Sequence, residues 1–299
     1  MIRPILSIFL CYLLSSCVSS VIELSQNEQT ELLRQIPSDE KCYAKPSFRK
    51  IRMANGMYYH QPKKAVALYL AAAKELKPYQ IQAPWAHKAY QQALGKGLEL
   101  IQNHQLWGTS VSAAGQNFQI AAYCDTKGSQ LTEIDTLYYA DKFTSSAFTP
   151  AIETHGRGVP MIAHTQWSEA RSKKLPFIPE IGYIYSVTAL AHWSDANFVS
   201  FQLLDSRDSP QLSADYTIPQ ALAQTATKSL VYQGIINVLR PENGLESMSL
   251  ISSEPIDPQR IPVIFVHGLA ATPKLWVKPA HELLEDPLIR DHYQFYAYF

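Results

Sequence analysis

Two stretches of the chain show the hydrophobic spacing of amphipathic helices. In residues 63–76, which follow Pro62, apolar side chains recur every three or four positions, and the same spacing runs through residues 85–102. This period places the apolar side chains on one helix face, and a proline suits a first helical turn. The proline-bounded segment 77–84 joins the two, so the pattern predicts an antiparallel helical hairpin. No second copy follows at a fixed period, and a helical repeat array is not expected.

From about residue 109 the pattern changes to one typical of strands. Alternating or β-branched and aromatic runs predict four strands, at residues 118–124, 159–163, 183–193 and 197–203. Helical spacing returns at residues 219–230, with Thr217 as the expected cap. We therefore expect an α+β accessory domain over residues 41–253, made of a helical hairpin and mixed or antiparallel strands.

The last forty residues show a third pattern. Residues 254–261 form a proline-punctuated linker, and the apolar run 263–266 that follows is typical of a buried parallel strand. A glycine turn, a short helix at 279–285 and an aromatic strand at 293–299 come next. Strand, helix and strand in this order predict one βαβ unit over residues 262–299, the start of an α/β sheet.

Composition and charge narrow the class of protein. Apolar residues make up 46% of the chain and charged residues 17%, which excludes collagen-like, coiled-coil and largely disordered chains. Lys and Arg number 26, as do Asp and Glu, and no basic stripe runs along the sequence. A nucleic-acid partner is therefore not expected.

The N-terminus has the pattern of a secretory signal peptide over residues 1–16. A positive charge at Arg3 precedes an apolar run at residues 5–14, which is shorter than the roughly 20 residues that span a bilayer. Small residues then lead up to Cys17, as at a cleavage site. An ordinary signal peptide, cleaved nearby, is one interpretation of this pattern.

The Leu-Ser-Ser-Cys sequence that ends at Cys17 also resembles a bacterial lipobox. The resemblance implies a diacylglyceryl group on Cys17 as the first mature residue, with residues 17–40 as a lipidated tether. More than one acyl chain makes membrane anchoring stable. Val18 follows the cysteine, and by resemblance to Gram-negative lipoproteins this implies an outer-membrane location facing the periplasm.

The mature domain then keeps two cysteines, Cys42 and Cys124. In an oxidising compartment they have two alternatives, one disulfide or two free thiols, and the sequence leaves both open. No C-x-x-C motif and no cluster of His and Cys at metal-ligand spacing is present, so no metal site is expected.

The most distinctive motif surrounds the predicted strand after the linker. The segment Pro262-Val-Ile-Phe-Val-His-Gly-Leu-Ala-Ala-Thr-Pro273, followed by Trp276, resembles the opening of an α/β-hydrolase domain of esterase or lipase type. With the lipoprotein signal, the chain resembles lipoprotein-anchored bacterial members of that superfamily. Softer similarities to those members lie at residues 156–160, 215–219 and 293–299. The resemblance implies serine ester hydrolysis of an ester or lipid-like small molecule, with no cofactor.

The chemistry explains why a His-Gly turn suits this role. Acyl transfer develops negative charge on a carbonyl oxygen, which backbone N–H groups aimed at it stabilise. Carried over from the family, the N–H of Leu269 supplies half of the oxyanion hole, Gly268 permits the sharp turn, and His267 supports the loop. The alternative is a buried strand that ends in a turn with a structural histidine.

No G-x-S-x-G motif occurs in the 299 residues, although this fold places its nucleophile there. Residues 262–299 suffice for two strands and one helix, too few for a covered parallel sheet. We therefore expect a truncated or fragmentary gene product, inactive alone because it lacks nucleophile, acid and base. The alternative is a non-catalytic envelope lipoprotein that acts as a binding or scaffold module.

Overall fold

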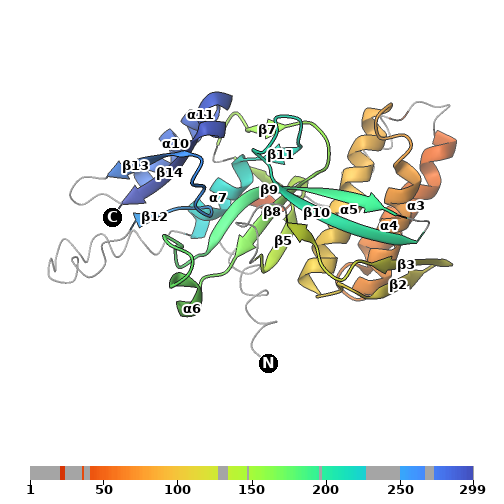
Figure 1. The fold of residues 1–299 in the computed structure, drawn as a ribbon. Helices are drawn as coiled ribbons and strands as arrows, with labels where there is room; N and C mark the ends of the chain where they lie inside the picture. The colour runs from red at the N-terminus through yellow and green to blue at the C-terminus, as the bar shows by residue number, and fades with distance from the viewer. Residues whose placement is uncertain are drawn as a thin grey trace.

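The fold is of the α+β class, as the sequence predicts. Three consecutive helices pack against a curled mixed sheet, and a smaller sheet with its own helices lies at the opposite end of the molecule (Figure 1). This architecture comes from a computed structural model. It describes residues 21–23, 36, 41–126, 134–146, 148–194, 197–226, 250–266 and 273–298.

The helical layer contains the predicted hairpin and one further helix. Helices α4 (Pro62–Leu76) and α5 (Pro84–Asn103) both begin at a proline, one residue before the predicted start. Helix α3 (Lys41–Met57) packs on α4 and was not predicted. Its sequence is rich in basic residues and includes Pro46 inside the helix. A proline inside a helix removes a backbone hydrogen bond, so in a sequence it usually indicates a helix end. For this reason the sequence pattern did not predict α3.

The main sheet has the order β2-β3-β10-β9-β8-β5, with β4 also paired to β10. Its strands are β2 (Ser110–Ala113), β3 (Gln116–Ile120), β4 (Asp125–Thr126), β5 (Thr136–Tyr139), β8 (Val159–Thr165), β9 (Tyr183–Trp193) and β10 (Phe198–Asp205). Strand β10 runs parallel to β3 and β4, and the other pairs are antiparallel. The strand predicted over 118–124 ends at residue 120, and the other three predictions are confirmed.

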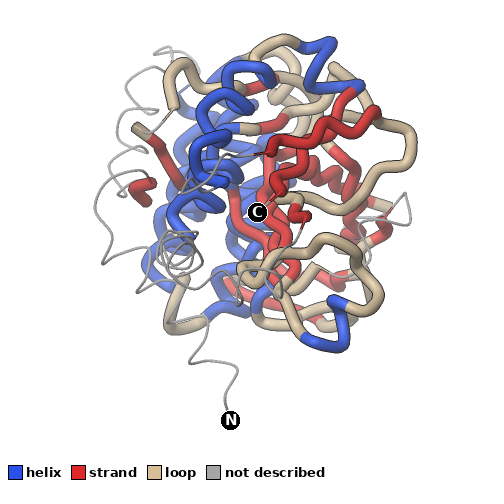
Figure 2. The backbone as a smooth tube through the Cα atoms, turned by 90° about the vertical axis from the view of Figure 1, so that its left-hand side faces the viewer, coloured by secondary structure: helices blue, strands red, loops and turns tan. Residues whose placement is uncertain are grey.

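The main core lies between the helices and this sheet. Figure 2 shows the helices gathered on one side of the strands. Tyr69 from α4, Leu98 from α5 and Phe118 from β3 are fully buried there. A Cβ added at Gly95 would lie 2.3 Å from the ring of Tyr139, so only glycine lets α5 approach β5 this closely.

Short elements lie beside the main sheet. Strand β1 (Val21–Glu23) pairs antiparallel with β6 (Phe143–Ser145). Three residues of the segment expected as a tether are therefore part of a two-stranded sheet. Two β-branched residues, which favour extended backbone, occupy this strand. The remaining short elements are η1 (Ala140–Lys142), β7 (Glu153–Thr154), α6 (Glu169–Ser172) and β11 (Ala214–Asp215), which pairs with β7.

Helix α7 (Thr217–Ala226) begins two residues before the predicted range, and its cap differs from the expected one. The carboxylate of Asp215 accepts hydrogen bonds from the backbone N–H groups of Thr217 (2.8 Å) and Ile218 (2.9 Å). Thr217 was expected as the cap, but its hydroxyl instead accepts a hydrogen bond from the backbone N–H of Ile152 (2.7 Å). The side-chain oxygen of Asp215 accepts from these N–H groups in either protonation state and takes the capping role here.

The C-terminal part forms a three-stranded sheet of order β12-β14-β13, in which β13 and β14 are parallel. A strand–helix–strand unit with parallel strands is therefore present, as predicted. The expected burial of its first strand is wrong, because β13 is an outer strand among the described residues and all six of its residues are exposed or half-buried. The backbone N–H of Ile184 donates to the carbonyl of Ser253 (2.7 Å), which links this part to the start of β9. The elements are β12 (Leu250–Ile251), β13 (Ile261–Val266), η2 (Pro273–Trp276), α10 (Val277–Leu284), α11 (Pro287–His292) and β14 (Tyr293–Tyr298).

Candidate functional site

A cavity of about 180 Å³ lies where the C-terminal sheet meets β9 and α7. Its lining is mostly apolar and comes from segments far apart in the chain. Ile184 belongs to β9, Ala223 to α7 and Phe295 to β14. A concave, mostly apolar space with a few polar groups is the usual form of a small-molecule site.

The predicted oxyanion residues His267, Gly268 and Leu269 lie outside the described residues, as does the predicted lipidation site Cys17. The aromatic residues nearest to the His-Gly segment on either side are described. Phe265 precedes it on β13 and Trp276 follows it in η2, and both line the cavity. Their rings stack with centroids 5.2 Å apart and planes 16° apart. The cavity wall therefore includes an aromatic residue from each side of the predicted site in the sequence.

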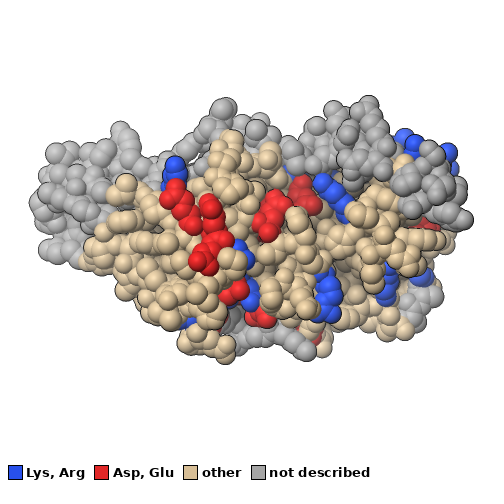
Figure 3. Space-filling view, turned by 90° about the horizontal axis from the view of Figure 1, so that it is seen from above, with Lys and Arg blue, Asp and Glu red and all other residues tan. Residues whose placement is uncertain are grey.

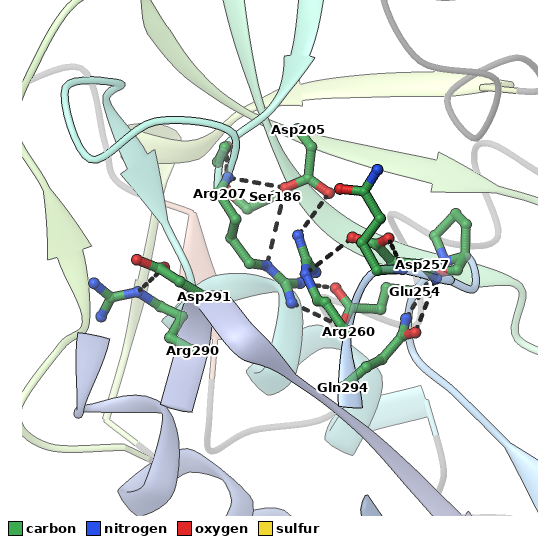
Figure 4. Close-up of polar contacts among 12 residues, drawn as sticks. Ser186, Asp205, Arg207, Glu254, Asp257, Arg260, Arg290, Asp291 and Gln294 are labelled. Carbon is green, nitrogen blue, oxygen red and sulfur yellow. Dashed lines mark hydrogen bonds and ion pairs between the residues drawn. The ribbon is translucent and has the colours of Figure 1, made fainter. Parts of the chain in front are cut away.

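Five charged residues, called the docking cluster below, lie beside the cavity: Asp205, Arg207, Glu254, Asp257 and Arg260 (Figure 4). Arg207 pairs with Glu254 and lies 3.9 Å from Asp205. Arg260 reaches Asp205 (3.4 Å) and Asp257 (3.1 Å). Burial lowers the pKa of Arg207, an effect that the nearby Asp205 opposes. The docking cluster therefore joins the end of β10 to the segment before β13.

Gln294 of β14 fixes the same segment from the other side and is almost completely buried. Its side-chain N–H donates to the carbonyl of Pro255 (2.6 Å). Its side-chain oxygen accepts hydrogen bonds from the backbone N–H of Asp257 (2.9 Å) and the hydroxyl of Tyr296 (2.7 Å). Residues 254–261, expected as a linker, are thus held by hydrogen bonds and ion pairs.

Buried His281 on α10 forms a second junction between the two parts of the molecule. One ring nitrogen, Nδ1, lies 3.1 Å from the side-chain oxygen of Gln220 on α7, and Nε2 lies 3.1 Å from the carbonyl of Pro150. The ring also stacks on Phe148 at 4.6 Å. Polar contacts therefore hold α10 against the main body, on the α7 side of the cavity.

A buried serine also lines the cavity, but its hydrogen bonding does not suit a nucleophile. The hydroxyl of Ser186 lies 3.1 Å from that of Ser206, which also accepts a hydrogen bond from Thr188. A catalytic serine needs an adjacent general base, and a second hydroxyl does not provide one. Ser186 is therefore part of a structural hydroxyl network.

The sequence left open whether Cys42 and Cys124 form a disulfide, and the structure describes the thiol of Cys124. Cys124 is a free thiol whose sulfur lies 3.4 Å from the carbonyl oxygen of Phe201. Burial raises its pKa to about 12, so it stays protonated and poorly reactive at neutral pH. The side chain of Cys42 lies outside the described parts of the chain. Within those parts, no group of three or more His, Cys, Asp and Glu residues is placed to hold a metal ion.

Surface charge is distributed unevenly. Figure 3 shows acidic side chains gathered over the end that carries α10, α11 and β7, with Lys and Arg spread over the helical end. Glu282, Glu285 and Asp286 are exposed on this acidic end. Across the described residues, no helix has both the length and the apolar content to cross a membrane.

Sequence reasoning missed the docking cluster and the cavity. The paired side chains of Arg207 and Glu254 lie 47 positions apart, and those of Arg260 and Asp205 lie 55 apart. No local spacing in the sequence signals such pairs. The stretch 254–261 did contain a hint, because three charged residues stand among its prolines.

Comparison of the chain with protein-family models, curated proteins and solved structures finds no match. A fold alone does not define a function, so the argument must come from the site itself. The relevant geometry is a mostly apolar cavity whose lining includes Phe265 and Trp276, the aromatic residues nearest to the His-Gly segment on either side.

Proposed function

We propose that this chain is a lipid-anchored protein of the α/β-hydrolase superfamily, of esterase or lipase type, with ester chemistry at the carboxyl end of β13. The observation that carries the proposal is that β13 and β14 pair in parallel and are connected along the chain by helices. The His-Gly segment begins directly after β13, and its two flanking aromatic residues line the cavity. Ligands of α/β sheets bind outside the carboxyl ends of the parallel strands, which supports this position.

The proposed role of the segment is to stabilise negative charge. When a serine attacks an ester, the carbonyl oxygen becomes an oxyanion, and the N–H of Leu269 donates a hydrogen bond to it. Gly268 lets the backbone turn, and His267 supports the loop. Residues 1–299 contain no G-x-S-x-G motif, so nucleophile, acid and base belong to a longer form in this proposal. The 299 residues alone are then inactive.

The deciding experiment begins with the DNA that follows codon 299. A frame that encodes G-x-S-x-G supports the proposal, and the product of that longer frame is then assayed with p-nitrophenyl butyrate. Leu269→Pro removes the N–H and should lower kcat about 10²–10³-fold. Leu269→Ala keeps the N–H and serves as the control. An unchanged kcat in Leu269→Pro, or unrelated downstream sequence, contradicts the proposal.

The anchor is tested separately. A radiolabelled fatty acid should enter the wild-type protein, and Cys17→Ala should abolish both labelling and membrane attachment. Labelled wild-type protein in the outer-membrane fraction is the expected result. A Cys17→Ala protein that stays on the membrane, with a wild type that never takes up label, contradicts a lipid anchor.

The second candidate function is a non-catalytic envelope lipoprotein that binds a ligand or partner. One observation favours it, because the cavity is mostly apolar, as a small-molecule site usually is, and the hydroxyl of its Ser186 contacts another hydroxyl and no general base among the described residues. The two candidates agree that the 299-residue chain hydrolyses no p-nitrophenyl butyrate. Turnover that disappears when one serine of this chain is replaced would overturn that shared expectation.

A further inference from the structure

We infer that the cavity binds the short acyl part of an uncharged ester. The identification of the ligand as an ester rests on the proposed function. The evidence for a neutral, apolar ligand comes from the size, lining and charge of the cavity, which do not depend on that function.

The size of the cavity limits the ligand. An apolar cavity of about 150 Å³ binds benzene, and this one measures about 180 Å³. It therefore accommodates a single aromatic ring or a short acyl chain. Ile184, Ile251 and Val277 supply aliphatic wall, and Phe265 and Phe295 supply aromatic wall.

The charge of the lining disfavours an anionic ligand. Among the described residues that line the cavity, Arg207 and Glu254 carry charge, and they pair with each other. Arg207 also faces Asp205 in the docking cluster, which holds three carboxylates and two guanidinium groups. A buried carboxylate needs a paired cation, and Arg207 already has its partners. A free fatty acid of the same chain length is therefore disfavoured relative to its ester.

Trp276 supplies further aromatic wall, with its ring stacked on that of Phe265. Its indole Nε1–H is closed off from the cavity, so Trp276 offers the ligand ring surface and no hydrogen bond.

The test uses the 299-residue chain in lipid nanodiscs and three water-soluble probes: ethyl butyrate, sodium butyrate and benzene. Calorimetric titration should show binding of ethyl butyrate and benzene, with butyrate at least tenfold weaker. Tryptophan fluorescence should change on ester binding and lose that change in Trp276→Phe. Equal binding of butyrate and ethyl butyrate, or no binding of ethyl butyrate, overturns the inference.

Two variants locate the ligand. Ala223→Phe places a ring in the cavity and should weaken ethyl butyrate at least tenfold, whereas Ala170→Phe on exposed α6 should not. Circular dichroism and the melting temperature establish that each variant is folded. Undiminished ethyl butyrate binding in a folded Ala223→Phe protein overturns the assignment to this cavity.

Failure of this inference and failure of the proposed function give different results. Binding of ethyl butyrate requires no turnover, so it can hold when the Leu269→Pro test or the downstream sequence contradicts ester hydrolysis. Esterase activity in the longer form, with no probe bound in the cavity, would instead retain the function and place its acyl site elsewhere.

Discussion

The two ends of the molecule are stabilised in different ways. In residues 41–226, helices and the main sheet enclose a large apolar core in which Tyr69 and Phe118 are 0% exposed. In residues 250–298, apolar side chains face outward, with Ile264 53% and Leu288 65% exposed. The first part has its own hydrophobic core, whereas the second depends on its contacts with the first.

Hydrogen bonds and ion pairs are prominent among those contacts, beside apolar ones such as Leu284 against Ile152 and Tyr216. The docking cluster holds one side of the C-terminal sheet, and His281 holds α10 on the other. Hydrogen bonds and ion pairs need defined geometry and do not close space as apolar side chains do. The two parts are therefore fixed relative to each other while an apolar space remains between them.

The strongest test of the comparison replaces a side chain in the enclosed core. Phe201 on β10 is 1% exposed, and its ring meets Trp107 edge-on at 6.0 Å. Phe201→Ala should lower the free energy of unfolding by about 3–5 kcal/mol, since it leaves a cavity in a packed interior. Urea denaturation followed by circular dichroism measures this change. A loss below about 1 kcal/mol would show that this core is loosely packed.

The next test breaks the polar junction. Glu254→Gln leaves Arg207 with only the more distant Asp205, and an uncompensated buried charge is costly. We expect the free energy of unfolding to fall by about 3 kcal/mol. This is near the lower end of the range for broken buried ion pairs, because Asp205 remains beside Arg207. Hydrogen exchange should accelerate in β14 but not in the central strand β9.

The control for that test is an exposed ion pair. Glu169 and Lys173 on α6 are four positions apart and solvent-exposed, so Glu169→Gln should change stability by about 0.5 kcal/mol or less. Equal effects of the two substitutions, or exchange that accelerates equally in β9 and β14, would contradict a separate polar attachment of the C-terminal part.

A third test concerns the cap of α7, the helix that lies between the two parts. Burial raises the pKa of Asp215 from its ordinary 3.8 to about 7. The folded state then holds a proton that the unfolded state has lost, so stability is greatest at low pH and declines as pH rises from 3.8 towards 7. The decline approaches about 1.4 kcal/mol per pH unit.

Asp215→Asn keeps a side-chain oxygen for the two backbone N–H groups but cannot ionise. The variant should therefore lose this decline. The amount by which its free energy of unfolding exceeds that of the wild type should be about 2 kcal/mol larger at pH 7.5 than at pH 5. Urea denaturation at the two pH values measures the comparison. Parallel pH dependence of the two proteins would show that Asp215 titrates near its ordinary pKa.

The enclosed part is also the part that the sequence predicts best. Strand β9 matches its predicted bounds because β-branched and aromatic residues fill it, and α4 and α5 follow from a clear helical period. Helix α3 was missed because Pro46 and its basic residues obscure that period. The cavity was missed for a different reason, since segments far apart in the chain meet there. The oxyanion role of Leu269 stays a prediction.

The smallest expected effect lies on the exposed face of the C-terminal sheet. Within the described residues, β13 is an outer strand of its sheet, and Ile264 is half exposed there. Ile264→Ser should change the free energy of unfolding by less than about 0.5 kcal/mol, as surface substitutions usually do. An apolar outer strand also favours association between copies, so the variant should self-associate less in analytical ultracentrifugation. A loss above 1 kcal/mol would show instead that this face is covered in the folded protein, and the contrast between the two ends would then be smaller than the exposed fractions indicate.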